Sequence, residues 1–207
     1  MPRTIESKRQ RLERLRVNLE TERDSFISHW RDLGDYLLPR RPRWVARDVN
    51  RGDRRNLKIY DGTGGLALRT LQSGLMSGIT SPAKPWFRLG IEGLNSIEPG
   101  PAQMWLKEVT DIMHSIFIRS NLYNCLPTLY GDIGAFGTGC MSVEEDFDSV
   151  IHCNVFPIGS YCISADDRGR VDTFCRKYAM TVRNLVSKFG IEKFSDGVKT
   201  NYDRNNL

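Results

Sequence analysis

The spacing of the hydrophobic residues changes near residue 140, and this change constrains the fold more than any other feature of the sequence. Before that point, apolar residues recur three, four or seven positions apart, which is typical of amphipathic helices. After it, apolar and polar residues alternate, and β-branched and aromatic side chains become frequent, which is typical of strands. A set of helices followed by an antiparallel β-meander predicts a protein of the α+β class.

Residues 4–38 are predicted to form one long amphipathic helix, which Pro39 and Pro42 end. At about 1.5 Å per residue this helix would reach roughly 50 Å, which is too long for a domain of this size to cover. We therefore expect it to meet another chain or a neighbouring copy, the alternative being a helix that lies over its own domain. Its apolar stripe follows a strict seven-residue spacing, through Ile5, Leu12, Leu19, Phe26 and Leu33.

A layer of helices and a run of strands are predicted in the rest of the chain. Gly74 and Gly78 lie four positions apart on the first of these helices, where they would let another backbone approach closely. Thr181 is expected to cap the last helix, and residues 195–207 are expected to add no further element. The helices are predicted at 64–79, 102–119, 121–136 and 182–189, and the strands at 86–91, 140–146, 149–156, 161–165 and 170–180.

The positive charge of the chain is concentrated in one segment. The 207 residues have a net charge of +5, and residues 40–58 hold eight of the 30 basic side chains but only two of the 25 acidic ones. The remainder is close to neutral. We therefore divide the chain into a long helix at 1–39, a basic irregular segment at 40–58 and an α+β domain at 59–207. The candidate DNA- or partner-binding residues are Arg40, Arg41, Arg43, Arg47, Arg51, Arg54, Arg55 and Lys58.

Such a concentration of charge indicates a polyanion or an acidic partner surface. Arginine side chains bind phosphate groups well, so one interpretation is contact with a polyanion. A second is contact with acidic residues of an adjacent subunit or another partner, and a third is a loop that only water contacts. No recognition helix or stacking platform accompanies the segment, so sequence-specific reading of a nucleic acid is not expected.

The sequence contains no constellation of residues that would support catalysis. The five cysteines have no CxxC or CxxH spacing, which favours free thiols in a reducing compartment over a zinc site. The three histidines are far apart, and residues 60–65 lack the pattern of a phosphate-binding loop. Aspartates in predicted turns suit local hydrogen bonding better than the metal-dependent hydrolysis that they would otherwise suggest. We expect no enzyme, cofactor or metal.

No membrane or secretion signal is present in the sequence. The longest run without a charged residue has 14 residues and is interrupted by glycine and proline, whereas a membrane span needs about 20 apolar residues. The first residues have no apolar stretch of the kind that secretory signals carry. The chain is therefore expected to be soluble and intracellular.

Several segments, in order along the chain, resemble one family of phage proteins. The glycine-rich turn and helix at 60–71, continued at 73–87, resemble the head-to-tail connector (portal) proteins of short-tailed bacteriophages. The resemblance extends from about residue 10 to 190. Its other matching segments are 36–41, 121–124, 134–139, 166–173 and 180–183.

The resemblance implies a structural subunit of a ring, dodecameric in this family, at one vertex of the phage capsid. Such rings nucleate capsid assembly with scaffolding proteins, dock the terminase, pass double-stranded DNA without sequence specificity during packaging and ejection, and hold the tail through adaptor proteins. The expected location is the virion vertex, and the host cytoplasm during assembly.

The family fold has a wing, a helical stem, a clip and a crown, and its members are more than twice as long as this chain. The resemblance therefore implies the N-terminal, mostly wing-forming portion, incomplete at its C-terminal end, as a fragment, a truncated product or half of a split portal. The alternative hypothesis is a small DNA-binding accessory protein that uses residues 40–58 and forms no ring.

Overall fold

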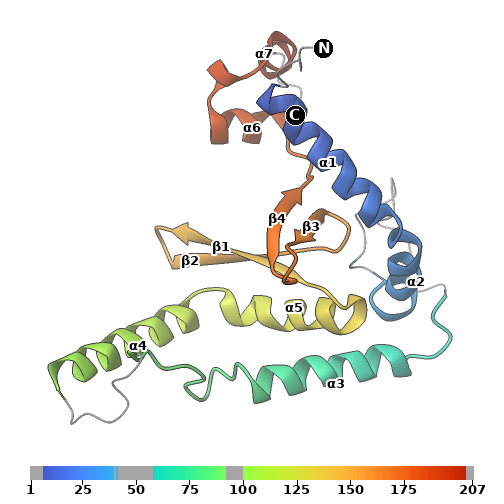
Figure 1. Ribbon diagram of the computed structural model, residues 1–207. Helices are drawn as coiled ribbons and strands as arrows, with labels where there is room; N and C mark the ends of the chain where they lie inside the picture. The colour runs from blue at the N-terminus through green and yellow to red at the C-terminus, as the bar shows by residue number, and fades with distance from the viewer. Residues whose placement is uncertain (1–6, 40, 42–57, 92–99, 204–207) are drawn as a thin grey trace. The chain divides into compact units, whose positions relative to one another are not determined.

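The computed structural model describes residues 7–39, 41, 58–91 and 100–203 (Figure 1). The chain divides into two compact units, one that ends at Cys175 and one that begins at Arg176. Helices and two small antiparallel sheets together confirm the α+β class. The elements are α1 (Lys8–Asp24), α2 (Ile27–Leu37), α3 (Thr63–Gly78), α4 (Pro101–Arg119), α5 (Leu122–Phe136), β1 (Cys140–Asp146), β2 (Val150–Phe156), β3 (Tyr161–Ala165), β4 (Val171–Arg176), α6 (Val182–Phe189), a 3₁₀ turn (Ile191–Lys193) and α7 (Asp196–Asp203).

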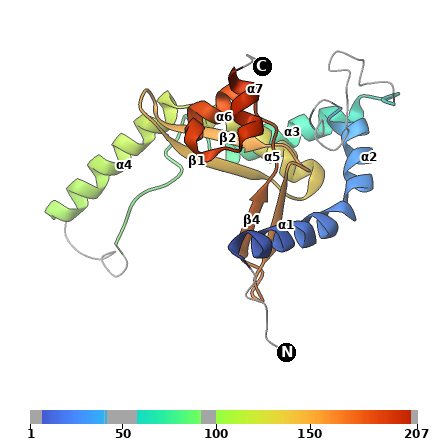
Figure 2. The same cartoon turned by 90° about the horizontal axis from the view of Figure 1, so that it is seen from above.

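The predicted single helix over 4–38 is wrong, because the chain bends between α1 and α2 (Figure 2). At the bend, the hydroxyl of Ser25 donates a hydrogen bond to the carbonyl oxygen of Glu22 at 2.7 Å. The backbone N–H of Phe26 donates to Arg23 at 2.9 Å, three residues back rather than four. Tightened bonds of this kind end a helix, and a serine side chain that takes up a backbone carbonyl favours the change of direction.

The seven-residue spacing does not mark one buried stripe on these two helices. Leu19 is buried, but Leu12 and Phe26, one heptad away on either side, are exposed. Helix α2 contacts the core through other positions as well, because Trp30 and Leu37 pack with Leu33 against buried residues. Ile5 lies outside the described residues.

Helix α3 lies along α5 (Figure 1), and glycines of α5 make this close packing possible. A Cβ atom at Gly134 would come within 2.9 Å of Leu71 and 3.1 Å of Leu68, so a larger residue there would displace these side chains. This role was expected of Gly74 and Gly78 on α3. That expectation fails within the described residues, because a Cβ atom at either position would meet nothing within 4 Å.

The strands form two separate two-stranded sheets rather than one continuous meander. Strands β1 and β2 pair antiparallel, with Cys140 opposite Phe156 and Val143 opposite Cys153. The chain then turns at 157–160, where Ser160 donates its backbone N–H to the Pro157 carbonyl at 3.1 Å. This turn separates the second sheet from the first.

Strands β3 and β4 pair with each other across a tight turn. Gly169 adopts a positive φ of 74°, and the backbone N–H of Asp166 donates to Arg170 at 2.8 Å. Strand β4 ends at Arg176, four residues before the predicted end.

Buried residues from helices and strands meet in two clusters of the larger unit. The first joins α3, the end of α5 and the start of β3, and the second joins the start of α5 to β2. The first cluster contains Leu68, Ala135, Phe136, Phe156, Ile158 and Tyr161, and the second Leu122, Leu126 and Cys153.

All five cysteines are free thiols, of which Cys153 and Cys162 are buried. Among the described residues, no helix is both long and apolar enough to cross a membrane.

The smaller unit contains α6 and α7. The predicted cap of α6 is confirmed, because the hydroxyl oxygen of Thr181 accepts a hydrogen bond from the N–H of Asn184 at 3.4 Å. The expectation that 195–207 would add no element is wrong, since α7 occupies Asp196–Asp203. Helices α6 and α7 contact each other, which explains how such a polar segment holds a helix.

Candidate functional site

The basic segment has two described members, Arg41 near its start and Lys58 at its end. Both meet carboxylates of the same chain, and these two contacts connect the ends of the segment to the helical layer. The other candidate residues, Arg40, Arg43, Arg47, Arg51, Arg54 and Arg55, lie outside the described residues.

Arg41 forms a two-pronged ion pair with Asp132 on α5. Its Nε donates to Oδ1 of Asp132 at 2.9 Å, and its Nη2 donates to Oδ2 at 2.6 Å. The Asp132 side chain is 2% exposed and the Arg41 side chain 23% exposed. Arginine–carboxylate pairs with two parallel hydrogen bonds are among the strongest and most directional polar contacts in proteins. Arg41 therefore points into the protein and holds the start of the basic segment against α5.

The position of Asp132 explains why it needs this partner. It sits between Gly131 and Gly134 on the part of α5 that packs against α3. Burial raises the pKa of Asp132, while the hydrogen bonds and the charge of Arg41 act in the opposite direction. Burial also raises the pKa of the nearby Tyr161 to about 12, so this phenol stays neutral at physiological pH. Because the phenol of Tyr161 is neutral, the negative charge that Arg41 binds is the carboxylate of Asp132.

Lys58 forms the second contact, in which its Nζ donates to Oδ2 of Asp35 on α2 at 2.7 Å. The hydrogen bond and charge of Asp35 raise the pKa of Lys58. Because Lys58 is exposed, water screens this pair, and it stabilises the fold far less than the buried pair does. Its effect is to neutralise one more positive charge of the segment.

Asp132 and Asp35 were not among the site residues predicted from the sequence. Asp132 carried a usable signal, because it is the only acidic residue in the otherwise apolar sequence of α5. A carboxylate on a helix face that is otherwise buried calls for a cationic partner. The identity of that partner could not be read from spacing, since Arg41 lies 91 positions away.

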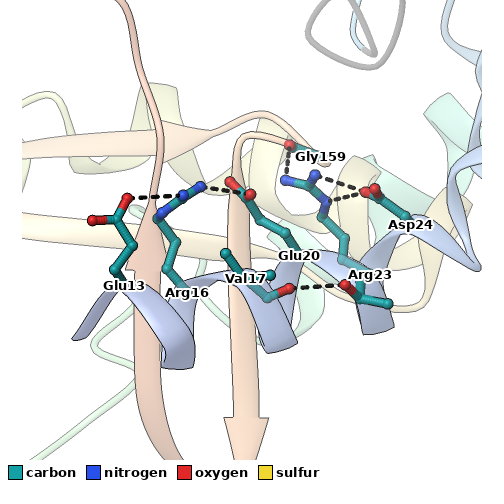
Figure 3. A network of polar contacts seen from close by, with 8 residues as sticks. Glu13, Arg16, Val17, Glu20, Arg23, Asp24 and Gly159 are labelled. Carbon is teal, nitrogen blue, oxygen red and sulfur yellow. Dashed lines mark hydrogen bonds and ion pairs between the residues drawn. The ribbon is translucent and has the colours of Figure 1, made fainter. Parts of the chain in front are cut away.

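The polar face of α1 is a network of short-range ion pairs (Figure 3). Arg16 lies between Glu20, at 2.6 Å, and Glu13, at 3.4 Å. Arg23 contacts Asp24 and also donates to the carbonyl oxygen of Gly159 at 3.0 Å, which ties α1 to the turn between the two sheets. In this network, Arg16 and Arg23 each contact at least one carboxylate of α1.

The apolar face of α1 is only partly covered. Leu12, Leu15 and Val17 are exposed, and a groove of about 710 Å³ runs between α1 and Phe174 of β4. That the first helix meets another chain stays a prediction.

The family comparison matches almost the whole chain. The model of the bacteriophage head to tail connecting protein family matches residues 9–206. The chain belongs to this family. The portal protein of Salmonella phage epsilon15 is 48% identical over 194 residues, which are 94% of this chain. The probable portal protein of Bordetella phage BPP-1 is 44% identical over 189 residues, which are 91% of this chain.

The resemblance to connector proteins seen in the sequence is thus confirmed. This connector-family chain spans about a third of the length of the curated relatives that it matches, 35% and 34% respectively. Membership in a family of structural proteins favours a non-enzymatic role. In the described part of the chain, no group of three or more histidine, cysteine, aspartate or glutamate side chains could hold a metal ion.

Proposed function

We propose that the chain is a structural subunit, or part of one, of a portal ring at a vertex of a phage capsid. The observation that carries this proposal is the match of the connector family over residues 9–206, together with 48% identity to a portal protein. In this role several copies form a closed ring, for which we propose the dodecamer of the family. DNA enters and leaves through the ring, and capsid, scaffolding, terminase and tail adaptor proteins bind it.

The surface of the larger unit supports a role in an assembly. Met104, Trp105 and Ile112 of α4 are each more than half exposed, as is Val143 of β1. Phe147, at the tip of the β1–β2 hairpin, is 97% exposed. Soluble monomers rarely leave so many large apolar side chains in water, whereas subunits cover them with neighbours.

The proposal is tested by locating the chain in the particles of the phage that encodes it. Antibodies raised against the 207-residue chain and labelled with gold are expected to mark a single vertex per particle, the vertex that bears the tail. An antibody against the main capsid protein is the control and should mark the whole shell. Labelling of the whole shell by the chain's own antibody, or particles with no label, would contradict the proposal.

We further propose that the six arginines outside the described residues contact DNA phosphates without sequence specificity. Each phosphate contact contributes about 0.9 to the slope of log K against log salt concentration. The variant Arg43→Gln/Arg54→Gln is therefore expected to lower this slope by about 2 in a fluorescence anisotropy titration with duplex DNA.

Lys58→Gln is the matched control, because Lys58 already pairs with Asp35 and should leave the slope unchanged. An unchanged slope in the arginine variant would assign the segment to a protein partner or to solvent. Steeply salt-dependent binding by a chain that stays monomeric would instead favour the accessory DNA-binding protein.

A further inference from the structure

The tip of the β1–β2 hairpin presents an aromatic side chain to solvent in acidic surroundings. Phe147 is 97% exposed, and Asp146 and Asp148 flank it in the sequence. Residues 140–150 include four acidic side chains and no basic one. Large aromatic side chains are the groups that most often anchor one protein on another.

The backbone of this tip is held in an unusual conformation. Val150 has a φ of 70°, which a β-branched residue rarely adopts. The carboxylate of Asp146 holds the turn, because it accepts a hydrogen bond from the hydroxyl of Ser149 at 2.6 Å and another from its N–H at 2.9 Å. These bonds lower the pKa of Asp146, which therefore stays charged. Such strained residues gather at binding sites, and a turn fixed in this way presents Phe147 with little entropy left to lose on binding.

The groove between α1 and β4 has an apolar floor. Leu12, Leu15 and Phe174 line it and are each between 43% and 55% exposed. The ring of Phe174 also stacks on the buried rings of Phe156 and Tyr161, with centroids 6.1 Å apart in both pairs. The floor is therefore fixed to the core of the larger unit. We name this surface the α1 groove.

The rim of the α1 groove is basic. Lys8, Arg9 and Arg16 line it, and Glu13 is the one acidic residue among its described lining residues. The groove has a volume of about 710 Å³, within the range of pockets that hold drug-sized ligands, so it has room for a phenyl ring. An apolar floor with a basic rim is complementary to an aromatic ring flanked by carboxylates.

The tip and the α1 groove do not meet within one chain. Phe147 would be covered if it lay in the groove of its own chain, and it is 97% exposed. The two surfaces share no residue, so a second copy can place its tip in the groove of the first while its own groove stays open to a third.

We propose that Phe147 of one copy inserts into the α1 groove of the next copy, with the acidic residues of the tip against the basic rim. The contact is head-to-tail, and contacts of this kind close into rings when the rotation between copies allows it. The inference rests on the proposed ring. It names two surfaces that hold neighbouring copies together, and it gives the first helix the partner expected from the sequence.

The first experiment removes the ring from the tip. Sedimentation velocity of the 207-residue chain is expected to show self-association weakened about 30-fold by Phe147→Ala, the effect of losing a central aromatic anchor. Tyr60→Ala is the matched control, because Tyr60 is also 97% exposed but lies in neither surface, and it should leave self-association unchanged. Thermal melts of both variants should match the parent, which shows that the fold is intact.

The second experiment changes the groove. Leu12→Glu places a carboxylate on the floor, where it would repel the acidic tip, and should abolish self-association. Because Leu12 is exposed and lies four positions from both Lys8 and Arg16, α1 accommodates this glutamate. Val17→Glu is the matched control, since Val17 is exposed on the same helix and does not line the groove.

The third experiment mixes the two weakened chains. The Phe147→Ala chain keeps its groove, and the Leu12→Glu chain keeps its tip. Each alone should stay monomeric, whereas an equimolar mixture should form a 1:1 dimer with the affinity of the parent contact. The dimer should not grow, because its remaining tip and groove are both altered.

Equal association of the Phe147→Ala and Tyr60→Ala chains, or a mixture that stays monomeric, would overturn the inference, as would a parent chain that is monomeric at its highest soluble concentration. A lower melting temperature of Leu12→Glu, with association of Phe147→Ala unchanged, would assign the groove to a segment of its own chain instead. If gold labelling marks the vertex while these variants associate normally, the portal role stands and the ring is built on another surface.

Discussion

Arg41→Ala is expected to destabilise the larger unit by about 3 kcal/mol, because it leaves the carboxylate of Asp132 buried without a cation. Loss of one partner of a buried ion pair typically costs about 3–5 kcal/mol, and the partial exposure of Arg41 places this pair at the lower end. Urea unfolding followed by circular dichroism measures the loss. The exposed Arg69→Ala on α3 is the matched control and should change stability by less than about 0.5 kcal/mol.

Two further readouts separate the loss of charge pairing from the loss of packing. The double variant Arg41→Met/Asp132→Leu removes both charges and should recover most of the stability, because apolar replacements of buried ion pairs are often close to neutral. A double variant as unstable as Arg41→Ala would show that the arginine side chain acts through its packing instead.

The second readout is pH. The pKa of Asp132 is already raised by burial, so the folded state holds this proton more tightly than the unfolded state, and stability falls as pH rises through that range. Without Arg41 the pKa rises further. The penalty of Arg41→Ala should therefore be complete well above the raised pKa of Asp132, and it should shrink as the pH falls through that pKa and Asp132 becomes protonated. If the loss of stability in Arg41→Ala does not change with pH, the conclusion that Arg41 acts by pairing with the charge of Asp132 is contradicted.

Phe136→Ala is expected to cost about 3–5 kcal/mol, the usual range for truncating a buried aromatic side chain. Phe136 is 8% exposed and lies in the cluster where the end of α5 meets Ile158 and Tyr161, so its loss opens a cavity between helices and strands. The midpoint of urea unfolding should fall while the slope of the transition stays the same, because the folded state remains intact.

Phe147 provides the control for this truncation, since it has the same side chain and is 97% exposed at the hairpin tip. Phe147→Ala should change the free energy of unfolding by less than about 0.5 kcal/mol. Similar losses at the two positions would show that Phe136 does not carry the core of the larger unit.

Most of the secondary structure followed from periodicity, and the exceptions have local or long-range causes. The predicted and observed bounds of β1 and β3 are the same, because their alternation ends at clear turn residues. The bend after Asp24 escaped prediction because it depends on one serine hydroxyl and on three-residue hydrogen bonds, which hydrophobic spacing does not report. The predicted strand at 86–91 is wrong, because these residues form no strand in the structure despite their alternating pattern.

The concentration of positive charge at 40–58 could be read from the sequence. Which of these basic residues pair with carboxylates of the same chain could not. Composition counted Arg41 and Lys58 equally with the other six, although the structure pairs both with carboxylates of the same chain. Asp132 belongs to a helix predicted from its apolar residues, and it meets Arg41 where α5 contacts α2, the helix that precedes Arg41. Contacts between residues so distant in sequence are set by topology, which local pattern cannot supply.

The same separation along the chain affects how the protein is made. Arg41 and Asp132 are 91 positions apart, so at about 5–20 residues per second the ribosome adds the second roughly 5–18 s after the first. During that interval the apolar residues of α2, including Trp30 and Leu37, have none of their core partners from α5, β2 and β3. The order of synthesis therefore sets how long each nascent subunit offers α2 to chaperones or to aggregation with its neighbours on the same messenger RNA.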